Sequence, residues 1–180
     1  MRRCVNVFGL AALLTCLAGC AASDTARVPE VAAPLRVPPT QVLSLRVRAT
    51  GVQVYVCTPD KADSTRSEWV FSAPTADLFD RSGKRMGRHY AGPTWEADDG
   101  SKVVGEVVAR DGAPDSSAIP WLLLRATSAT GHGILNQTRS IQRLHTVGGK
   151  APADGCSAAR SGAEARVPYT ADYLFYRERR

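Results

Sequence analysis

Short apolar runs separated by turn-forming residues recur along most of this chain, and they constrain its fold more than any other feature. Residues 43–49 and 52–57 each alternate apolar with polar side chains, the period of a half-buried strand. Residues 80–84 and 98–101 are hairpin-type turns, because glycine and aspartate tolerate positive φ. About eight to ten such runs predict a mainly β fold, a single antiparallel β-sandwich or barrel-like domain with little helix. The pattern does not choose between the two.

Individual segments give more detailed expectations. Residues 69–71 form a short strand that we expect to end before Pro74. The continuously apolar residues 120–124 indicate a strand buried on both faces, or a short buried helix. Residues 134–147 are the longest segment without glycine or proline, and their Thr, Ile and Val content favours strand over helix. A chain of 180 residues suits one such domain.

The N-terminus carries the pattern of a secretory signal. Arg2 and Arg3 precede an apolar stretch too short to span a membrane, and small residues follow it. Residues 17–20, Leu-Ala-Gly-Cys, resemble the lipobox of bacterial lipoproteins, in which the cysteine is lipidated. The resemblance implies a signal peptide over 1–19, an acylated Cys20 and, with Ala21 next to it, an outer-membrane anchor facing the extracytoplasmic side. The alternative is an ordinary cleavable signal with a chance cysteine.

The residues after Cys20 read as a spacer. Residues 20–40 are rich in alanine and proline, which predicts an extended tether before a single domain over 41–180. Residues 1–19 hold two of the 23 basic side chains and none of the 17 acidic ones, so the mature chain keeps 21 basic against 17 acidic groups, a net charge of +4. This mild, dispersed charge indicates a solvated surface and no nucleic-acid partner.

Cysteine usage agrees with export. Once Cys4 and Cys16 leave with the signal and Cys20 carries lipid, Cys57 and Cys156 remain. Two thiols in an oxidising compartment predict one disulfide between them, and the alternative is two separate buried thiols. The chain has no C-x-x-C motif that would indicate a redox-active pair.

Several longer strings together look like a family of exported bacterial and fungal proteins known as domain of unknown function 3455. The likeness covers about residues 35–177 and is carried by residues 51–57, 69–71, 89–96, 99–101, 119–124, 141–143, 148–149, 155–156 and 167–173. The resemblance implies one extracytoplasmic domain and no particular activity. Some members carry a malate dehydrogenase label, but this chain lacks the G-x-G-x-x-G fingerprint and the βαβ pattern of such enzymes.

Residues 89–105 contain the densest group of unusual side chains. We interpret His89, Tyr90, Trp95 and Glu96, around the Gly92-Pro93 corner, as candidate residues for binding a small apolar or sugar-like molecule. The alternative is that the rings belong to the core.

Enzymatic readings have less support. His89, His132 and His145 could share a metal with Glu96 or Asp99, but their separations match no local metal motif. Glu96 could pair with Asp98 or Asp99 for glycoside hydrolysis, although a solvated hairpin turn explains those aspartates more simply. No nucleophile motif and no cofactor motif is present. A structural envelope component that meets a partner through its edge strands is the remaining alternative, and the oligomeric state stays open.

Overall fold

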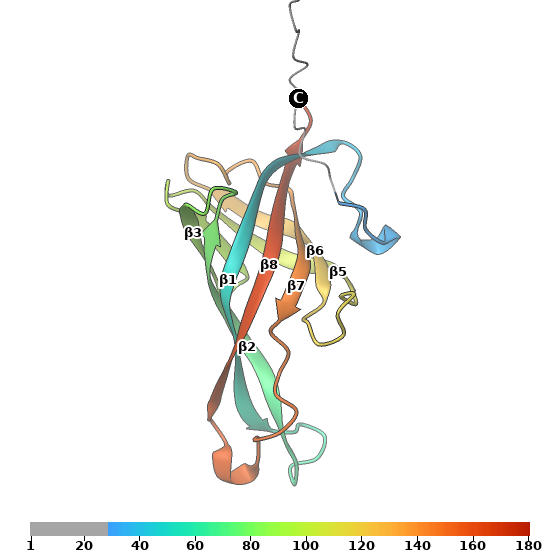
Figure 1. Cartoon of the computed structure of the whole chain (residues 1–180), viewed down its shortest axis with the longest axis vertical. Coiled ribbons are helices and arrows are strands. Elements are labelled where there is room, and N and C mark those ends of the chain that lie inside the picture. Colours follow the sequence, from blue (N-terminus) through green and yellow to red (C-terminus); the bar gives the residue numbers. More distant parts are fainter. Residues whose placement is uncertain (1–28) are drawn as a thin grey trace, which may run out of the picture.

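The chain forms a closed antiparallel β-barrel of eight strands (Figure 1). The computed structural model describes residues 29–180, so the expected signal peptide and Cys20 lie outside the described residues. The strands are β1 (Gln41–Pro59), β2 (Ser67–Phe79), β3 (Arg85–Tyr90), β4 (Thr94–Ala97), β5 (Lys102–Asp111), β6 (Trp121–Thr130), β7 (Ser140–Gly148) and β8 (Glu164–Glu178). Two short 3-10 turns, η1 (Ala33–Leu35) and η2 (Ala158–Arg160), complete the described structure.

Each strand pairs with its sequence neighbours, and β8 returns to pair with β1. The closing ladder is long and runs from Gln41 opposite Glu178 to Val56 opposite Glu164. The prediction of a mainly β, antiparallel domain is confirmed, and the closing ladder makes the sheet a barrel. The expected turns at residues 80–84 and 98–101 connect β2 to β3 and β4 to β5.

Strands β1 and β2 are longer than the sequence pattern indicated. Thr50 and Gly51 do not end the first strand, because β1 continues unbroken to Pro59. The expectation that the next strand ends before Pro74 is wrong: β2 runs through Pro74 to Phe79. Its pairing with β3 begins only at Ala76, so at Pro74 one side of β2 has no neighbouring strand. A proline is tolerated there because its missing N–H breaks no ladder bond.

Three strands extend beyond the rest of the barrel. Residues 52–59 of β1, 67–75 of β2 and 164–168 of β8 pair with each other but go past the ends of β3 and β7. We call these residues the arm; they form the long lower part of the molecule in Figure 1. The arm continues the wall of the barrel on one side only, so one end of the barrel has a raised rim.

The structure assigns the secondary structure of the two segments, residues 120–124 and 134–147, for which the sequence pattern fitted both strand and helix. Residues 121–124 begin β6, with Leu122 and Leu124 inside the barrel, and no helix forms there. Residues 134–139 are a loop, and only residues 140–147 of the expected strand belong to β7. The loop has a structural role, because Leu135 is only 1% exposed and belongs to the interior cluster.

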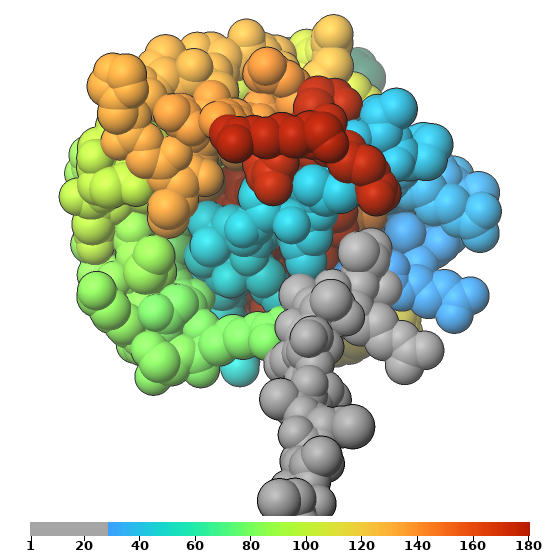
Figure 2. Space-filling view, turned by 90° about the horizontal axis from the view of Figure 1, so that it is seen from above, coloured from blue at the N-terminus to red at the C-terminus, as the bar shows by residue number. Residues whose placement is uncertain are grey.

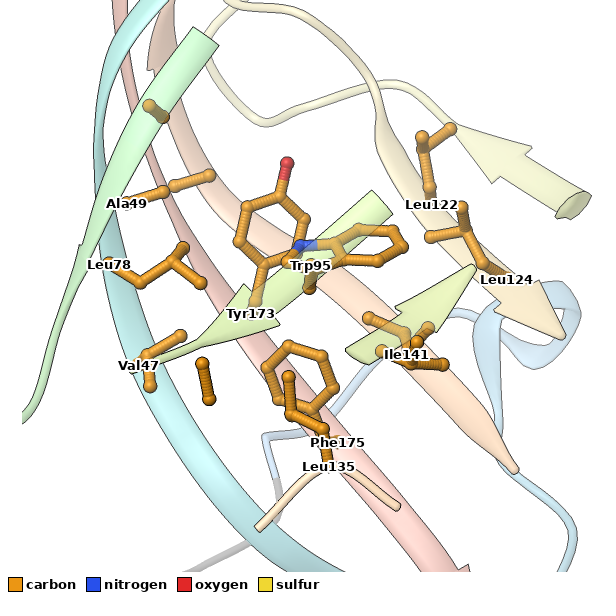
Figure 3. Packing of buried hydrophobic residues seen from close by; sticks show 14 of the residues in the cluster. Val47, Ala49, Leu78, Trp95, Leu122, Leu124, Leu135, Ile141, Tyr173 and Phe175 are labelled. Atoms are coloured by element: carbon orange, nitrogen blue, oxygen red, sulfur yellow. The ribbon is translucent and has the colours of Figure 1, made fainter. Parts of the chain in front are cut away.

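This β6–β7 loop closes one end of the barrel. Asp99 holds it in place, since one carboxylate oxygen accepts the backbone N–H of Ile134 at 2.9 Å and the other accepts the Ser101 hydroxyl at 2.6 Å. The Ser101 hydroxyl oxygen in turn accepts the backbone N–H of Leu135 at 3.1 Å. Leu135 then lies against Phe175 inside the barrel (Figure 3). Seen from this end, the loop lies beside the start of β1 and the end of β8 (Figure 2).

The described part of the expected tether packs on the barrel. Leu35 is fully buried against Leu144, Leu174 and Tyr176 on the outer surface, and Val31 and Val37 flank it. This cover explains why the apolar run beginning at Trp121 is shielded on both faces: its outward side chains meet the same cluster. The ordered part of the domain therefore includes residues before Gln41.

The predicted disulfide joins Cys57 to Cys156 across 99 positions of sequence. It ties the end of the arm to the loop of residues 149–163. Two further hydrogen bonds attach this loop to the arm, from the Tyr55 hydroxyl to the Gly149 carbonyl at 2.6 Å and from Trp69 Nε1 to the Asp154 carbonyl at 2.9 Å.

Removal of this bridge should destabilise the barrel measurably. We expect the double substitution Cys57→Ser with Cys156→Ser to lower the free energy of unfolding by about 2–5 kcal/mol, because the open chain regains the freedom of a long loop. Urea unfolding of the oxidised protein measures this difference. A reducing agent should bring the wild type to the midpoint of the double variant; equal midpoints under oxidising conditions would contradict the prediction.

Candidate functional site

The four candidate residues lie on adjacent, paired strands but on two faces of the sheet. His89 on β3 is directly opposite Trp95 on β4 in the ladder. Both point into the barrel, where His89 is 3% and Trp95 1% exposed. Tyr90 and Glu96 are their sequence neighbours, and successive strand residues point to opposite faces. The structure therefore brings the four residues together as an inner pair and an outer pair.

The inner pair is part of an aromatic cluster at the centre of the barrel. The rings of His89 and Trp95 are stacked, with centroids 4.4 Å apart and planes 12° apart. Tyr173 from β8 packs edge-on against both, at 4.9 Å from His89 and 5.2 Å from Trp95. Figure 3 shows the Tyr173 hydroxyl pointing away from Leu135 and Phe175, and so away from the barrel end that the β6–β7 loop closes.

Gly105 on β5 makes room for this cluster. A Cβ atom at this position would lie 3.3 Å from the Trp95 ring, with Ile141 and the Arg125 carbonyl oxygen each at 3.4 Å. Glycine within a strand often marks such a close approach. The absence of a side chain at Gly105 lets the indole extend across the barrel.

His89 is held as a neutral ring of known tautomer. Its Nδ1 lies 2.8 Å from the Thr94 carbonyl oxygen, which can only accept, so Nδ1 carries the proton. The pKa of His89 is lowered to about 3, and burial is the largest cause. The hydrogen bond to Thr94 raises the pKa, whereas the charge of Arg143 lowers it further. Neutral His89 therefore keeps an acceptor lone pair on Nε2.

The outer pair forms a surface network. The Tyr90 hydroxyl donates to Glu96 at 2.7 Å, and Arg88 Nη2 donates to the same carboxylate oxygen at 3.1 Å. The Tyr90 hydrogen bond, followed by that of Arg88, holds the pKa of Glu96 below its usual value. The same bond raises the pKa of Tyr90. These contacts satisfy Tyr90 and Glu96 on the outside of the barrel and do not involve His89 or Trp95.

A cavity of about 320 Å³ opens at the end of the barrel that carries the arm. Its apolar wall includes Phe71, Leu122 and Leu124, and its polar wall includes Gln53 and Arg143. The complete lining consists of Gln53, Phe71, Ser72, Pro74, His89, Ala91, Gly92, Pro93, Trp95, Val107, Leu122, Leu124, Arg143 and Tyr173. Strands β1 to β8 all contribute to the cavity or to the turns at its edge. Of the four candidate residues, His89 and Trp95 line it, whereas Tyr90 and Glu96 do not.

Several buried polar groups close to the cavity have unmet hydrogen-bonding capacity. Gln53 Nε2, Trp95 Nε1 and the hydroxyls of Tyr169 and Tyr173 lack a hydrogen bond of good geometry within residues 29–180. The two tyrosine hydroxyls interact with each other, that of Tyr169 also with Gln53 and that of Tyr173 also with Arg143. Burial, as the largest cause, raises the pKa of both tyrosines. Most buried polar groups in proteins have a partner, so four such groups close together set this region apart from the apolar part of the core.

The three histidines do not form one site. His89 is inside the barrel, His132 lies in the loop between β6 and β7, and His145 lies on the outer surface 2.8 Å from Asp172. Across residues 29–180, no group of three or more His, Cys, Asp and Glu side chains is arranged to hold a metal ion.

The cavity residues that sequence reasoning missed include Arg143, Gln53, Phe71 and Tyr173. Arg143 follows the buried residues Ile141 and Gln142 and reads as one more polar residue of a strand. Its one sequence signal was its membership of the string 141–143 that carries the family resemblance. Phe71 was predicted as part of a strand, but nothing in the sequence places that strand over the barrel mouth.

The fold and cavity together define a class: a closed eight-stranded antiparallel barrel, a size that leaves space inside for side chains or for one small ligand. Residues 38–177 match the family described as "Protein of unknown function (DUF3455)", and the chain belongs to this family. No curated protein and no solved structure shows a significant match to the chain.

The buried, neutral His89 should make stability depend on pH. Histidine in the unfolded chain has a pKa near 6.5, above the folded value of about 3, so between these values the unfolded chain binds one more proton. The contribution of His89 to stability is therefore complete above about pH 6.5 and is lost as pH falls toward 3, by at most about 1.4 kcal/mol per pH unit. Unfolding free energies of wild type and His89→Phe, measured from pH 7 to 4, test this. Other groups titrate alike in both proteins, so wild type should lose stability relative to His89→Phe as the pH falls; parallel curves would contradict the prediction.

Proposed function

We propose that this domain is a binding protein that holds a small, largely apolar molecule in the cavity at the barrel mouth. The observation that carries the proposal is the cavity itself. It is about twice the size of the ~150 Å³ apolar cavity known to bind benzene, and it falls in the range of ligand pockets. Apolar side chains form most of its wall and a few buried polar groups converge on it, the composition typical of small-molecule sites.

The same geometry favours an apolar ligand over a sugar. Sugar binding on an aromatic ring needs an accessible ring face, but Trp95 is 1% exposed, with His89 stacked on it and Tyr173 at its edge. Phe71, at 50% exposure, is the more accessible aromatic ring at the cavity rim.

The arrangement gives less support to an enzyme that uses His89 with Glu96. These side chains lie on opposite faces of the sheet, and Glu96 is engaged by Tyr90 and Arg88 outside the barrel. Among the described residues, those that line the cavity include no carboxylate to pair with His89. General acid–base catalysis requires such groups within hydrogen-bond reach of one substrate.

A structural role through edge strands is also restricted. A closed barrel has no free edge where its strands are fully paired. Within residues 29–180, residues 67–75 of β2 in the arm keep a side without a paired strand.

Blocking the cavity rim should abolish binding of a neutral apolar probe. Val107 lines the cavity at 39% exposure, whereas its neighbour Val108 is 51% exposed and is outside the lining. We expect Val107→Trp to weaken binding of N-phenyl-1-naphthylamine by about tenfold or more, because the larger ring fills the mouth. The matched Val108→Trp variant should bind like wild type. Probe fluorescence titration measures both; no probe binding by wild type, or equal binding by all three proteins, would remove this site.

We also propose that the domain is an exported lipoprotein held at the outer membrane through Cys20. The sequence supports this through its signal pattern and lipobox-like string. The Cys57–Cys156 bridge suits an extracytoplasmic compartment, where disulfides persist. No helix among residues 29–180 is long and apolar enough to cross a membrane. In this proposal the acyl chains on Cys20 attach the protein to the membrane, and their buried methylenes contribute ~0.8 kcal/mol each.

Substitution of the acylated residue tests this location. We expect Cys20→Ser to move the protein from the membrane fraction to the soluble periplasmic fraction, because the acyl chains can no longer be attached. Cell fractionation with immunodetection measures the shift, and Cys16→Ser is a matched control that should leave membrane association unchanged. Membrane association of the Cys20→Ser protein equal to wild type would reject the anchor.

A further inference from the structure

Arg143 is a cation at the cavity without an anionic partner. On β7, its Nε and Nη2 donate to the Pro120 carbonyl oxygen at 3.2 and 2.8 Å. Within residues 29–180, no carboxylate forms an ion pair with it. A guanidinium has five N–H donors, so the bonds to Pro120 use only part of its capacity, and the Tyr173 hydroxyl interacts with the same side chain. Its side chain is partly buried and lines the cavity directly.

The other unmet polar groups around Arg143 are also donors. Gln53 Nε2, Trp95 Nε1 and the Tyr173 hydroxyl all belong to cavity-lining residues, and none has a hydrogen bond of good geometry among the described residues. The Tyr173 hydroxyl does interact with Arg143 and Tyr169, which places it beside the cation. Gln53, Trp95 and Tyr173 are at most 2% exposed, so water from outside the cavity does not satisfy them. Arg143 and three residues with unmet donors therefore line one cavity, and the donor atoms themselves lie buried in its wall.

Negative charge is absent from the described lining of the cavity. No Asp or Glu is among the described residues that line the cavity, and His89 is neutral with a single acceptor on Nε2. Leaving a charge unpaired in a region of low dielectric is costly, so this lining favours a ligand that carries the missing negative charge.

We propose that the ligand carries a carboxylate, bound by Arg143 together with the Tyr173 hydroxyl and Gln53 Nε2, while its apolar body lies against Phe71, Leu122 and Leu124. The proposal rests on the binding function proposed above and adds the chemical class of the ligand. A carboxylate suits the site because its two oxygens match the planar guanidinium fork and its single charge balances that of Arg143. A phosphate monoester would bring nearly two charges to a site with one cation.

The size of the cavity suggests a saturated ten-carbon chain as a probe. Decanoate and 1-decanol have the same apolar body and differ in the head group, so they separate apolar binding from recognition of the charge. Both can be titrated by displacement of N-phenyl-1-naphthylamine from the wild-type protein at neutral pH. We expect decanoate to bind about tenfold or more tightly than 1-decanol, because only the carboxylate can form charge-assisted hydrogen bonds with Arg143.

Arg143→Gln should remove this preference. It keeps a polar donor near Pro120 but has no charge, so decanoate affinity should fall about tenfold or more while 1-decanol affinity stays within about threefold. Arg143→Lys, which keeps the charge, should retain part of the decanoate preference. Arg48→Gln on the outer face of β1 is the control for net charge and should match wild type.

The outcomes distinguish this proposal from the proposed function. If wild type binds neither decanoate nor 1-decanol and no neutral probe, the binding function itself fails. If wild type binds both with equal affinity, the apolar site stands and the carboxylate proposal is overturned. The comparison of the two probes on wild type decides the matter even if Arg143→Gln does not fold, which circular dichroism would reveal.

Discussion

The closing ladder between β1 and β8 is the constraint on which the rest of the structure depends. Once Gln41 pairs with Glu178 and the sheet is continuous, every strand residue faces either the interior or the outside. An eight-stranded barrel has little interior space, so each inward side chain competes for it. The inward set includes His89, Trp95 and Tyr173, whose rings fill the middle of the barrel. Leu135 fills one end, and the other end is left for the cavity.

The unequal lengths of the strands determine where the cavity opens. Because β1, β2 and β8 continue as the arm, Phe71 and Gln53 lie beyond the ends of the other strands and form one wall of the cavity. The disulfide from Cys57 and the hydrogen bond from Tyr55 to the loop of residues 149–163 hold that wall in position without a ligand. A preformed wall lowers the entropy cost of binding, since less has to be ordered when a ligand enters.

The sequence was sufficient to predict strands and turns, but it did not predict which distant strands pair with each other. Alternating residues and Asp-Gly turns predicted an antiparallel β domain, and cysteine usage predicted the Cys57–Cys156 bridge. The choice of a barrel depended on the β1–β8 pairing, between segments more than a hundred residues apart, which no local pattern encodes. For the site, the period of two already separates His89 from its neighbour Tyr90 and could have assigned them to opposite faces. The role proposed for Arg143 could not be predicted, because it depends on which of the described residues surround its side chain in space.

The position of the disulfide also bears on how the barrel closes during folding. The Cys57 backbone N–H donates to the Ala163 carbonyl at 2.9 Å, so the bridge lies at the arm end of the closing ladder, and Gln41 and Glu178 at its other end are 137 positions apart. Bringing such distant segments together is the slow, entropically costly step for a β topology. In a chain that has already oxidised, the bridge keeps the loop before β8 close to Cys57 on β1, so the two strands can pair progressively toward Gln41. The rate of folding is then coupled to the thiol–disulfide chemistry of the compartment in which the chain emerges.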